Sequence, residues 1–580
     1  MSNLIYACWR DPEDALDEAS LNRVADRISP VETRRHPHHV VMNRSDCLCL
    51  TGPVGAAISE GTSAHLGAFE GRWPEWHAPG AELPDGTFAL VRSNGARTEV
   101  CSDFAGSRTL WYTQTGKHFF ASTSQRALVC LLEGLDLDRS AVAWFLSSGS
   151  LGPSAAWDKR LSRLPRGARL ELDWMHWRLD LHAPPADFHP RRMLASDCRH
   201  ELMGILKEAI QQFDFSSGTW AFPLSGGYDS RFILSLLYEG GLRPQTMTWG
   251  LGASLSQPGN DAFVAKRLAG HYGLPHDYLL TEASEDPPER VVDAFLSASG
   301  GTTDQLYPYL DGLRLWSAFP ERGIDGVIRG DEGFGWIPVN SAQHARTSVG
   351  MMVLADFMDE ATAEQIADGK QWIPENLERR EDETIAVYRD RLYHSFRIPI
   401  GLAALNDVKA PFVEIASPLL SRRVLEFVRE MPDQFRTDKG LFKDLARSVS
   451  PPVPYATMGA DDDRNGYLGS LAYSRWLGDE LGTEIAHSLF PTRFRESLLA
   501  GIGRAPSPWA PTRSLRAALK RIIPTPWVRA VRAQMGPILP GQRLLSLRSS
   551  LICRMVRLLE EDSRLLGALR ENPSPTEISS

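Results

Sequence analysis

A glycine- and serine-rich segment has the residue types of a phosphate-binding loop. It lies between the apolar run 220–224 and the helical pattern 231–237, and it reads Ser225-Gly226-Gly227-Tyr228-Asp229-Ser230. Glycines let backbone N–H groups approach a pyrophosphate closely, a helix N-terminus favours an anion, and serine hydroxyls donate to phosphate oxygens. Asp229 would hold the magnesium ion that accompanies such a phosphate. We therefore predict a polyphosphate site here; the alternative is a turn that only caps a helix.

A second acidic turn follows a later strand of the predicted fold. The apolar run 326–328 leads directly into Arg329-Gly330-Asp331-Glu332-Gly333-Phe334-Gly335-Trp336. In a sheet of parallel strands this turn can face the first one, so that Asp331 joins Asp229 around the same phosphate. Two carboxylates share one triphosphate without repulsion only when a metal ion lies between them. A surface turn would also contain Gly-Asp-Glu, but the preceding strand favours a site.

The elements that must position these turns alternate between strand and helix. We predict helices at 196–213 and 261–272 and strands at 220–224, 245–250 and 326–328. Such alternation is typical of a parallel, doubly wound sheet. Ligands of these sheets bind beyond the carboxyl ends of the strands, where both turns fall. From about 345 to 480 the pattern is largely helical.

The first 185 residues have a different pattern, in which short apolar strands are separated by turns. Examples are a strand at 87–91 and a hairpin formed by 110–113 and 118–122. A proline-containing segment at 183–190 indicates a linker. We therefore predict three parts: a β-rich domain at 1–185, an α/β domain at 186–505 and a basic helical extension at 506–580.

Length and composition exclude several classes of protein. The chain has 580 residues, which is too long for one ordinary core, and it is 43% hydrophobic and 23% charged. No apolar run is long enough for a membrane helix, and the N-terminus lacks the pattern of a secretory signal, so we expect a cytoplasmic protein without membrane insertion. Seven scattered cysteines suit a reducing compartment, and none has zinc spacing. The net charge of -9 argues against nucleic acid as a partner.

The C-terminal region carries a basic block in this otherwise acidic protein. Between Arg504 and Leu559 there is no Asp or Glu, and ten further basic residues follow Arg504: Arg513, Arg516, Lys520, Arg521, Arg529, Arg532, Arg543, Arg548, Arg554 and Arg557. Such a block could dock an acidic peptide, a partner protein or a membrane surface. Alternatively, it is a helical tail whose arginines pair with acidic residues of the main body.

The two turns together resemble the class B asparagine synthetase superfamily. Its synthetase domain carries S-G-G-x-D-S, the PP-loop spelling of ATP pyrophosphatases, and then a D-E-x-F-G loop. The segments 408–414 and 439–447 are similar to later motifs of that domain, and 85–90, 103–112, 120–122 and 164–167 resemble the family's glutaminase-like domain. The resemblance implies an α/β protein: an N-terminal glutaminase-like sandwich of the N-terminal-nucleophile (Ntn) type, then a doubly wound PP-loop domain with a helical extension.

Departures from the family pattern narrow the expected activity. Ser2 stands where the family's glutaminase has its nucleophilic cysteine, and Cys8 lies inside the predicted first strand, so we do not expect glutamine hydrolysis. Ile328 occupies the position of an acidic residue of the aspartate-amidating enzymes. Where those enzymes carry an R-x-K loop, the stretch 455–464 offers only Arg464 as a cation.

A synthetase with an ATP site, no glutaminase and an altered acceptor site is expected to form an amide within one substrate. The chain looks most like a lasso-peptide cyclase. That resemblance implies adenylation of an Asp or Glu side chain of a precursor peptide, followed by macrolactam closure by its N-terminal amine, with release of pyrophosphate and AMP. The alternatives are a β-lactam synthetase-like or ammonia-dependent asparagine synthetase-like enzyme, or a non-catalytic relative that binds nucleotide or peptide.

The resemblance also assigns residues and partners. Asp229 and Asp331 would hold Mg²⁺, Lys439, Lys443 and Arg464 are candidate cations for the adenylate, and Asp304 would line a peptide pocket. The expected ATP contacts are Pro223, Leu224, Ser225, Gly226, Gly227, Asp229, Ser230, Trp249, Gly250 and Gly330. The implied cofactors are ATP and Mg²⁺. The implied partners are the precursor peptide, a leader peptidase and a leader-recognition protein.

Overall fold

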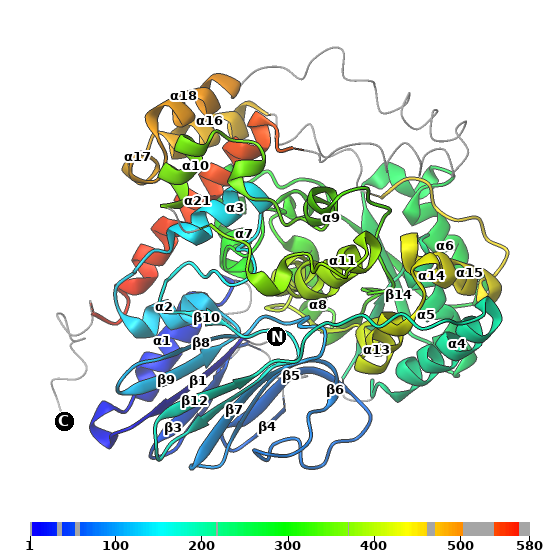
Figure 1. Ribbon diagram of the computed structural model, residues 1–580, viewed down its shortest axis with the longest axis horizontal. Helices are drawn as coiled ribbons and strands as arrows, with labels where there is room; N and C mark the ends of the chain where they lie inside the picture. The colour runs from blue at the N-terminus through cyan, green and yellow to red at the C-terminus, as the bar shows by residue number, and fades with distance from the viewer. Residues whose placement is uncertain are drawn as a thin grey trace.

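The computed structural model describes residues 3–31, 37–52, 58–215, 218–368, 371–460, 470–502 and 539–567. Figure 1 shows the N-terminal strands gathered at one end of the molecule and the green and yellow helices of the α/β part beside them. The last helix, drawn in red, lies against helices of the N-terminal part.

Two six-stranded antiparallel sheets form the N-terminal part, in the orders β10-β8-β9-β1-β3-β2 and β12-β11-β7-β6-β5-β4. The first sheet contains β1 (Leu4–Trp9), β2 (His39–Met42), β3 (Asp46–Leu50), β8 (Trp111–Gln114), β9 (His118–Ser122) and β10 (Ser162–Arg163). The second contains β4 (Ile58–Glu60), β5 (Ser63–Glu70), β6 (Asp85–Ser93), β7 (Arg97–Ser102), β11 (Arg169–Asp173) and β12 (Arg178–His182). The predicted two-sheet sandwich is therefore confirmed.

The period of two along β1 explains how the sandwich packs. Tyr6 and Cys8 belong to the core between the two sheets, whereas Ile5 and Ala7 belong to the core beneath the helices. The helices on that outer face are α1 (Glu18–Ile28) and α2 (Gln125–Leu132). Cys8 is fully buried, as its place inside the first strand predicts.

The α/β part is built on a five-stranded parallel sheet with the order β15-β14-β13-β16-β17. Its strands are β13 (Trp220–Pro223), β14 (Gln245–Gly250), β15 (His276–Leu280), β16 (Gly326–Ile328) and β17 (Glu414–Ala416). In chain order these are the third, second, first, fourth and fifth strands. The winding therefore reverses between β13 and β16, as in a doubly wound fold, and the predicted fold class is confirmed.

Helices cover both faces of this sheet. Phe222 of β13 packs against helices on one face, and its neighbour Ala221 packs against helices on the other. The first group is α4 (Ala195–Gln212), α5 (Tyr228–Glu239), α6 (Asp261–His271), α13 (Arg422–Glu430) and α15 (Gly440–Val449), and the second includes α7 (Pro288–Ser299) and α8 (Arg314–Glu321). Further helices are α9 (Ala342–Ser348), α11 (Ile385–Leu392), a π-helix at Tyr393–Leu402, α12 (Ala403–Asp407) and α14 (Asp433–Arg436).

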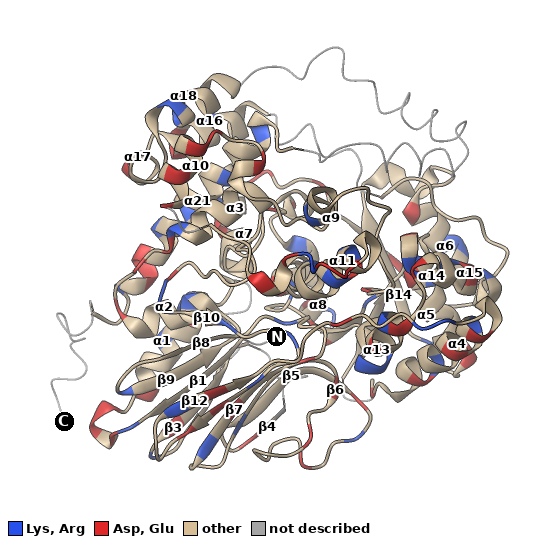
Figure 2. Ribbon diagram, viewed as in Figure 1, with Lys and Arg blue, Asp and Glu red and all other residues tan. Residues whose placement is uncertain are grey.

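A third group of helices contains the described part of the basic C-terminal block. Helix α21 (Gln542–Ser563) packs against α2, α3 (Arg139–Ser148), α16 (Leu471–Leu481), α17 (Glu484–Leu489) and α18 (Thr492–Gly501), with α10 (Glu360–Ala367) beside α3. Arg548 pairs with Asp304, and Arg554 with Asp293. Of the two readings of this block, the described residues support pairing with the main body. Figure 2 shows basic and acidic segments interleaved along these helices.

Element positions agree closely with the sequence for the α/β part. The strands at 245–250 and 326–328 are β14 and β16, and the helices at 196–213 and 261–272 are α4 and α6 with bounds shifted by one residue. β12 ends at His182 and α4 begins at Ala195, on either side of the predicted linker. The short strand β17 falls inside the region predicted as largely helical. No helix among the described residues is long and apolar enough to span a bilayer.

Candidate active site at the reversal point of the parallel sheet

The two predicted turns meet at the reversal point of the sheet. β13 and β16 are neighbouring parallel strands, so their carboxyl ends open at the same edge, and the chain leaves them in different directions. A Cβ atom on Gly330 would lie 3.0 Å from the Cβ atom of Asp229 and 3.2 Å from the amide nitrogen of Ser230. The second turn therefore runs directly across the first turn of α5, and the absence of a side chain at 330 permits this approach.

Hydroxyl groups close the first turn without capping the helix that follows. The backbone N–H of Ser225 donates to Oγ of Ser230 at 3.1 Å, and that of Gly227 donates to Oγ of Ser225 at 3.2 Å. The N–H of Gly226 donates to Asp261 at 3.0 Å. Gly227 is the N-cap of α5, and no side chain accepts a hydrogen bond as its cap. The N-terminus of this twelve-residue helix therefore lies at the site, and its cap residue offers no side chain to accept a hydrogen bond from the first backbone N–H groups.

Asp229 belongs to a cluster in which one lysine serves two carboxylates. The ammonium group of Lys439 lies 3.1 Å from both oxygens of Asp229 and 2.9 Å from Glu332. Burial and the neighbouring charge of Glu332 raise the pKa of Asp229 to about 6, although Lys439 opposes the shift. Burial also disfavours the charge of Lys439, but the two carboxylates hold its pKa above the ordinary value. The cluster therefore keeps a fixed cation beside the helix terminus.

Asp331 lies in a different charge environment. Its carboxylate accepts hydrogen bonds from the guanidinium of Arg329 at 3.1 Å and from the hydroxyl of Ser417 at 3.3 Å. Burial alone would raise the pKa of Asp331, but Arg329, with Lys409 nearby, lowers it below its usual range. The structure thus places both predicted metal ligands at the same edge, each paired with its own cation.

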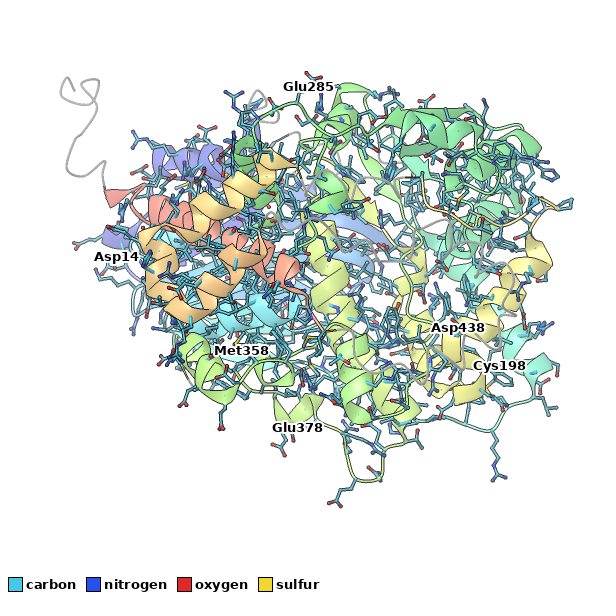
Figure 3. The ribbon with its side chains drawn as sticks, turned by 90° about the horizontal axis from the view of Figure 1, so that it is seen from above. Asp14, Cys198, Glu285, Met358, Glu378 and Asp438 are labelled. Carbon is cyan, nitrogen blue, oxygen red and sulfur yellow. The ribbon has the colours of Figure 1, made fainter. Side chains whose placement is uncertain are left out.

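The structure separates the two candidate lysines. Asp438 and Lys439 both have left-handed backbone conformations, with φ of 56° and 48°, and this turn directs Lys439 towards Asp229. Asp438 is labelled in Figure 3, at the start of the yellow helical segment. Lys443, one turn further along α15, instead pairs with Asp438 at 2.9 Å and lies 6.0 Å from the ring centre of Tyr228. Lys439 is therefore the cation beside Asp229.

A cavity of about 340 Å³ opens in front of these groups. It is lined by Pro223, Leu224, Ser225, Asp229, Ser230, Thr248, Trp249, Asp261, Arg329, Gly330, Asp331 and Ala460. Eight of these residues are predicted ATP or metal contacts. Gly226, Gly227 and Gly250 do not line it. Gly226 packs against Val264 and Ala456, and Gly250 packs against Ala460.

Some predicted positions lie elsewhere. The carboxylate of Asp304 is buried and bonded to Arg548 at 2.7 Å, and Asp304 does not line this cavity. Arg464 and Ser2 lie outside the described residues. Cys8 is buried in β1, and burial raises the pKa of its thiol above the ordinary range. A buried, protonated thiol is a poor nucleophile.

Two contributors to the site were not assigned from the sequence. Glu332 shares Lys439 with Asp229 and also accepts the backbone N–H of Phe334 at 2.7 Å. The hydroxyl of Tyr393, from the π-helix, donates to the backbone carbonyl of Glu332 at 2.8 Å. The acidic pair 331–332 was a visible signal for Glu332. Nothing around 393 marks that tyrosine, since its role follows from a contact across 61 residues.

The donor atoms at this edge fit a magnesium ion bound with a polyphosphate. Mg²⁺ takes one or two carboxylates together with substrate phosphates and water, and both Asp229 and Asp331 line the cavity. Among the residues that the structure describes, no three or more Asp, Glu, His or Cys side chains form a metal-binding group. An ion at this edge would complete its ligands with phosphate oxygens and water.

Comparisons with known proteins add little to this geometry. No protein-family model matches the chain, and no curated protein matches it. A solved structure described as the allosteric regulatory enzyme of purine biosynthesis shares 9% identity, covers 66% of this chain and 93% of its own, and has a TM-score of 0.21. A likeness at this level carries no inference about activity. The chain's own residues therefore carry the proposal that follows.

Proposed function

We propose that this chain is an ATP-dependent ligase that forms AMP and closes a macrolactam in a peptide, as a lasso-peptide cyclase does. The observation that carries the proposal is the pairing at the reversal point of the sheet. There, an α-helix N-terminus with no side-chain cap faces the carboxylates of Asp229 and Asp331, with Lys439 bonded to Asp229. Helix termini of this kind bind phosphate groups, and carboxylates of this kind bind the magnesium that accompanies them.

In the first step, a side-chain carboxylate of the peptide attacks the α-phosphorus of ATP. A bond forms between the carboxylate oxygen and the α-phosphorus, which gives an acyl-adenylate. The bond between the α-phosphorus and the oxygen that bridges to the β-phosphate breaks, and pyrophosphate leaves. The N-terminus of α5 holds the phosphates, and Asp229 and Asp331 would hold Mg²⁺, which neutralises phosphate charge. Lys439 would stabilise negative charge on the phosphorus, because its ammonium group pairs with Asp229 at 3.1 Å.

In the second step, the N-terminal amine of the same peptide attacks the activated carbonyl carbon. The amide bond forms, the amine loses a proton and AMP leaves with the bonding electron pair. This step uses no ammonia and therefore needs no thiol that hydrolyses glutamine. Cys8, in the described part of the N-terminal domain, is buried. The enzyme's main contribution is to hold amine and acyl group together, since effective molarity supplies much of such a rate.

The first experiment measures pyrophosphate release with three kinds of acceptor. Linear peptides with a free N-terminal amine and an internal Asp or Glu should support release, whereas aspartate with ammonia and a β-amino acid analogue should not. Release with either small substrate instead would favour an asparagine synthetase-like or β-lactam synthetase-like enzyme. Absence of ATP binding would favour a non-catalytic relative.

The second experiment tests the carboxylates directly. Asp229→Asn and Asp331→Asn should each reduce pyrophosphate release at least 100-fold, because each removes a carboxylate that would hold Mg²⁺ beside the phosphates. Asp444→Asn is the matched control, since Asp444 lies on the exposed side of α15 and pairs with Arg447. Near-normal release from either site variant would contradict the two-carboxylate site.

A further inference from the structure

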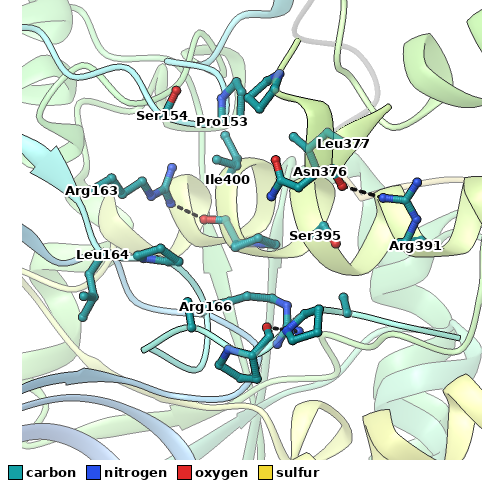
Figure 4. Close-up of a pocket in the computed structure, with 18 of the residues that line it drawn as sticks. Pro153, Ser154, Arg163, Leu164, Arg166, Asn376, Leu377, Arg391, Ser395 and Ile400 are labelled. Carbon is teal, nitrogen blue, oxygen red and sulfur yellow. Dashed lines mark hydrogen bonds between the residues drawn. The ribbon is translucent and has the colours of Figure 1, made fainter. Parts of the chain in front are cut away.

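A second cavity lies between the N-terminal sandwich and the helices that cover the α/β part. Its volume is about 570 Å³, and it shares no lining residue with the cavity at the reversal point. Figure 4 shows Arg163 at the left, Arg166 at the lower centre and Arg391 at the right, with Ser395 and Ile400 of the π-helix between Arg163 and Arg391. The linker residues 183–186 form part of the wall. The cavity therefore lies between the N-terminal sandwich and the helices of the α/β part.

The lining of this cavity is strongly basic. Five arginines and no Asp or Glu line it: Arg108, Arg163, Arg166, Arg380 and Arg391. Three of them have carboxylate partners outside the lining. Arg108 pairs with Glu414, Arg380 with Asp187 at 2.7 Å and Arg391 with Glu383 at 2.6 Å.

Arg163 and Arg166 differ from the other three. Among the described residues, neither has a carboxylate within the 4.0 Å of an ion pair, and their bonds go to neutral oxygens. Arg163 donates to the carbonyl of Pro399 and to Thr109, and Arg166 donates to the carbonyls of Phe104 and Pro184. Arg166 is 7% exposed. A guanidinium this deeply buried is costly unless an anion accompanies it.

The charges around these two arginines are of both signs. Arg429 lies over the same Phe104 ring as Arg166, and one of its buried terminal nitrogens has no hydrogen-bond partner. Burial, together with the charge of Arg429, lowers the pKa of Arg166 to about 9, although Asp187 and Asp103 oppose the shift. Burial lowers the pKa of Arg163 to about 10 against the opposing charge of Asp407. Both arginines still carry their charge at neutral pH.

The remaining walls are apolar and poor in backbone donors. Six prolines, which lack an N–H group, line the cavity: Pro153, Pro165, Pro184, Pro185, Pro374 and Pro399. Trp372 stands at the wall with 63% of its surface exposed. Polyphosphate sites use clustered backbone N–H groups at a helix terminus, as at 225–230, whereas walls of proline and tryptophan suit an extended peptide. The volume is that of an ordinary ligand pocket.

From these contacts we infer that the cavity binds an acidic segment of a peptide, with its carboxylates paired with Arg163 and Arg166. The identification of that peptide as the substrate rests on the proposed function. The π-helix lies near both sites, since Ser395 and Ile400 line this cavity while Tyr393 contacts Glu332, whose carboxylate shares Lys439 with Asp229. A substrate peptide anchored here would therefore contact the element that also supports the reaction site.

Binding can be measured without ATP and without turnover. The probe is a dansyl-labelled peptide of four residues that ends in glutamate, compared with its counterpart ending in glutaminamide. Fluorescence anisotropy should show saturable binding of the acidic probe and at least tenfold weaker binding of the neutral one. Arg166→Gln should weaken binding of the acidic probe at least tenfold. Equal binding of both probes, or an unchanged affinity in Arg166→Gln, would overturn the inference.

Two further variants separate binding from folding. Trp372→Ala removes an exposed wall residue, so the protein should melt as the wild type does while its affinity for the probe falls. Arg178→Gln is the matched control, because Arg178 is exposed on β12 and pairs with Asp180. Inorganic phosphate is the competing arm: tight phosphate binding with no saturable peptide binding would assign the cavity to a phosphate and overturn the peptide inference. The binding assay contains no ATP, so its result does not depend on whether the enzyme releases pyrophosphate.

Discussion

The site shows how neighbouring charges give two aspartates different pKa values. Asp229 shares Lys439 with Glu332, and burial raises the pKa of Asp229 to about 6. Asp331 accepts from Arg329, which lowers the pKa of Asp331 below its usual range. Asp331 is therefore a permanent anion, whereas the charge of Asp229 depends on Lys439. The function of a carboxylate here is set by the cation beside it.

The two lysines of 439–447 have different partners, so we expect their substitutions to have unequal effects. Lys439→Gln should reduce pyrophosphate release about 100-fold or more, because it removes the cation that contacts Asp229 and Glu332. Lys443→Gln should change release by less than about threefold, since Lys443 pairs with the partly exposed Asp438. Both variants are measured under the same ATP and peptide concentrations. A larger loss from Lys443→Gln would mean that the wrong lysine has been assigned.

At the scale of elements, the turn between β13 and α5 is held by close packing. A Cβ atom on Gly226 would lie 2.5 Å from the Cβ atom of Ala456 and 2.9 Å from that of Val264. Gly226→Ala should therefore displace the turn, costing about 1 to 3 kcal/mol of unfolding free energy and lowering pyrophosphate release. Urea unfolding measures the first effect.

The matched control for that glycine lies inside a helix. Gly204 is exposed on α4, and a Cβ atom there would have no neighbour within 4 Å. Gly204→Ala should stabilise the protein by about 0.5 to 1 kcal/mol and leave pyrophosphate release unchanged. If both alanine variants behaved alike, the packing around Gly226 would not control the turn.

At the scale of the whole molecule, α21 connects parts of the chain that are far apart in sequence. Buried Arg548 bonds to Asp304 and to the backbone carbonyls at the end of α3. Arg548→Met should cost about 3 to 5 kcal/mol, because Asp304 would remain buried without its partner. Adding Asp304→Asn should recover part of that loss. Arg564→Met is the control: this exposed arginine should change unfolding by less than about 0.5 kcal/mol.

A contact between the N-terminal sandwich and the α/β part makes the stability of the protein depend on pH. Glu70 of β5 is buried and pairs with Arg423 of α13 at 2.8 Å. Burial, with Asp85 nearby, raises the pKa of Glu70 to about 7. Because the folded state then binds the proton more tightly than the unfolded chain, this stability is present below about pH 4.3 and is lost as pH rises through 7.

Glu70→Gln should remove this pH dependence. The variant should be more stable than the wild type by about 1 to 2 kcal/mol at pH 8, where the wild type must bury a carboxylate, and nearly equal at pH 5. Arg423 keeps partners on α4, since it also bonds to Glu208 and Gln212. Thermal melts at the two pH values measure the difference. A variant less stable at pH 8 would show that the ion pair outweighs the burial of Glu70.

The sequence by itself determined the secondary-structure elements and the place where their pattern changes, because these depend on residues that are close together along the chain. The strands at 245–250 and 326–328, the helix after 230 and the change of pattern near 185 follow from period, turn residues and alternation. From these, both the parallel sheet and the meeting of two turns at its edge could be predicted. The assignments of ATP, magnesium and a peptide to that edge stay predictions.

Only the tertiary structure decided which side chains meet. Lys439 reaches Asp229 across 210 residues, Arg548 reaches Asp304 across 244, and the arginine-lined cavity joins 106–186 to 372–400. Local pattern carries no information about such distances, because each depends on how whole elements pack. The same packing paired Arg548, Arg554 and Arg557 of α21 with Asp304, Asp293 and Glu480, which decides for these residues between the two alternatives that the sequence left open. Local chemistry therefore indicated the phosphate turn, whereas its charge partners and the second cavity arose from the fold.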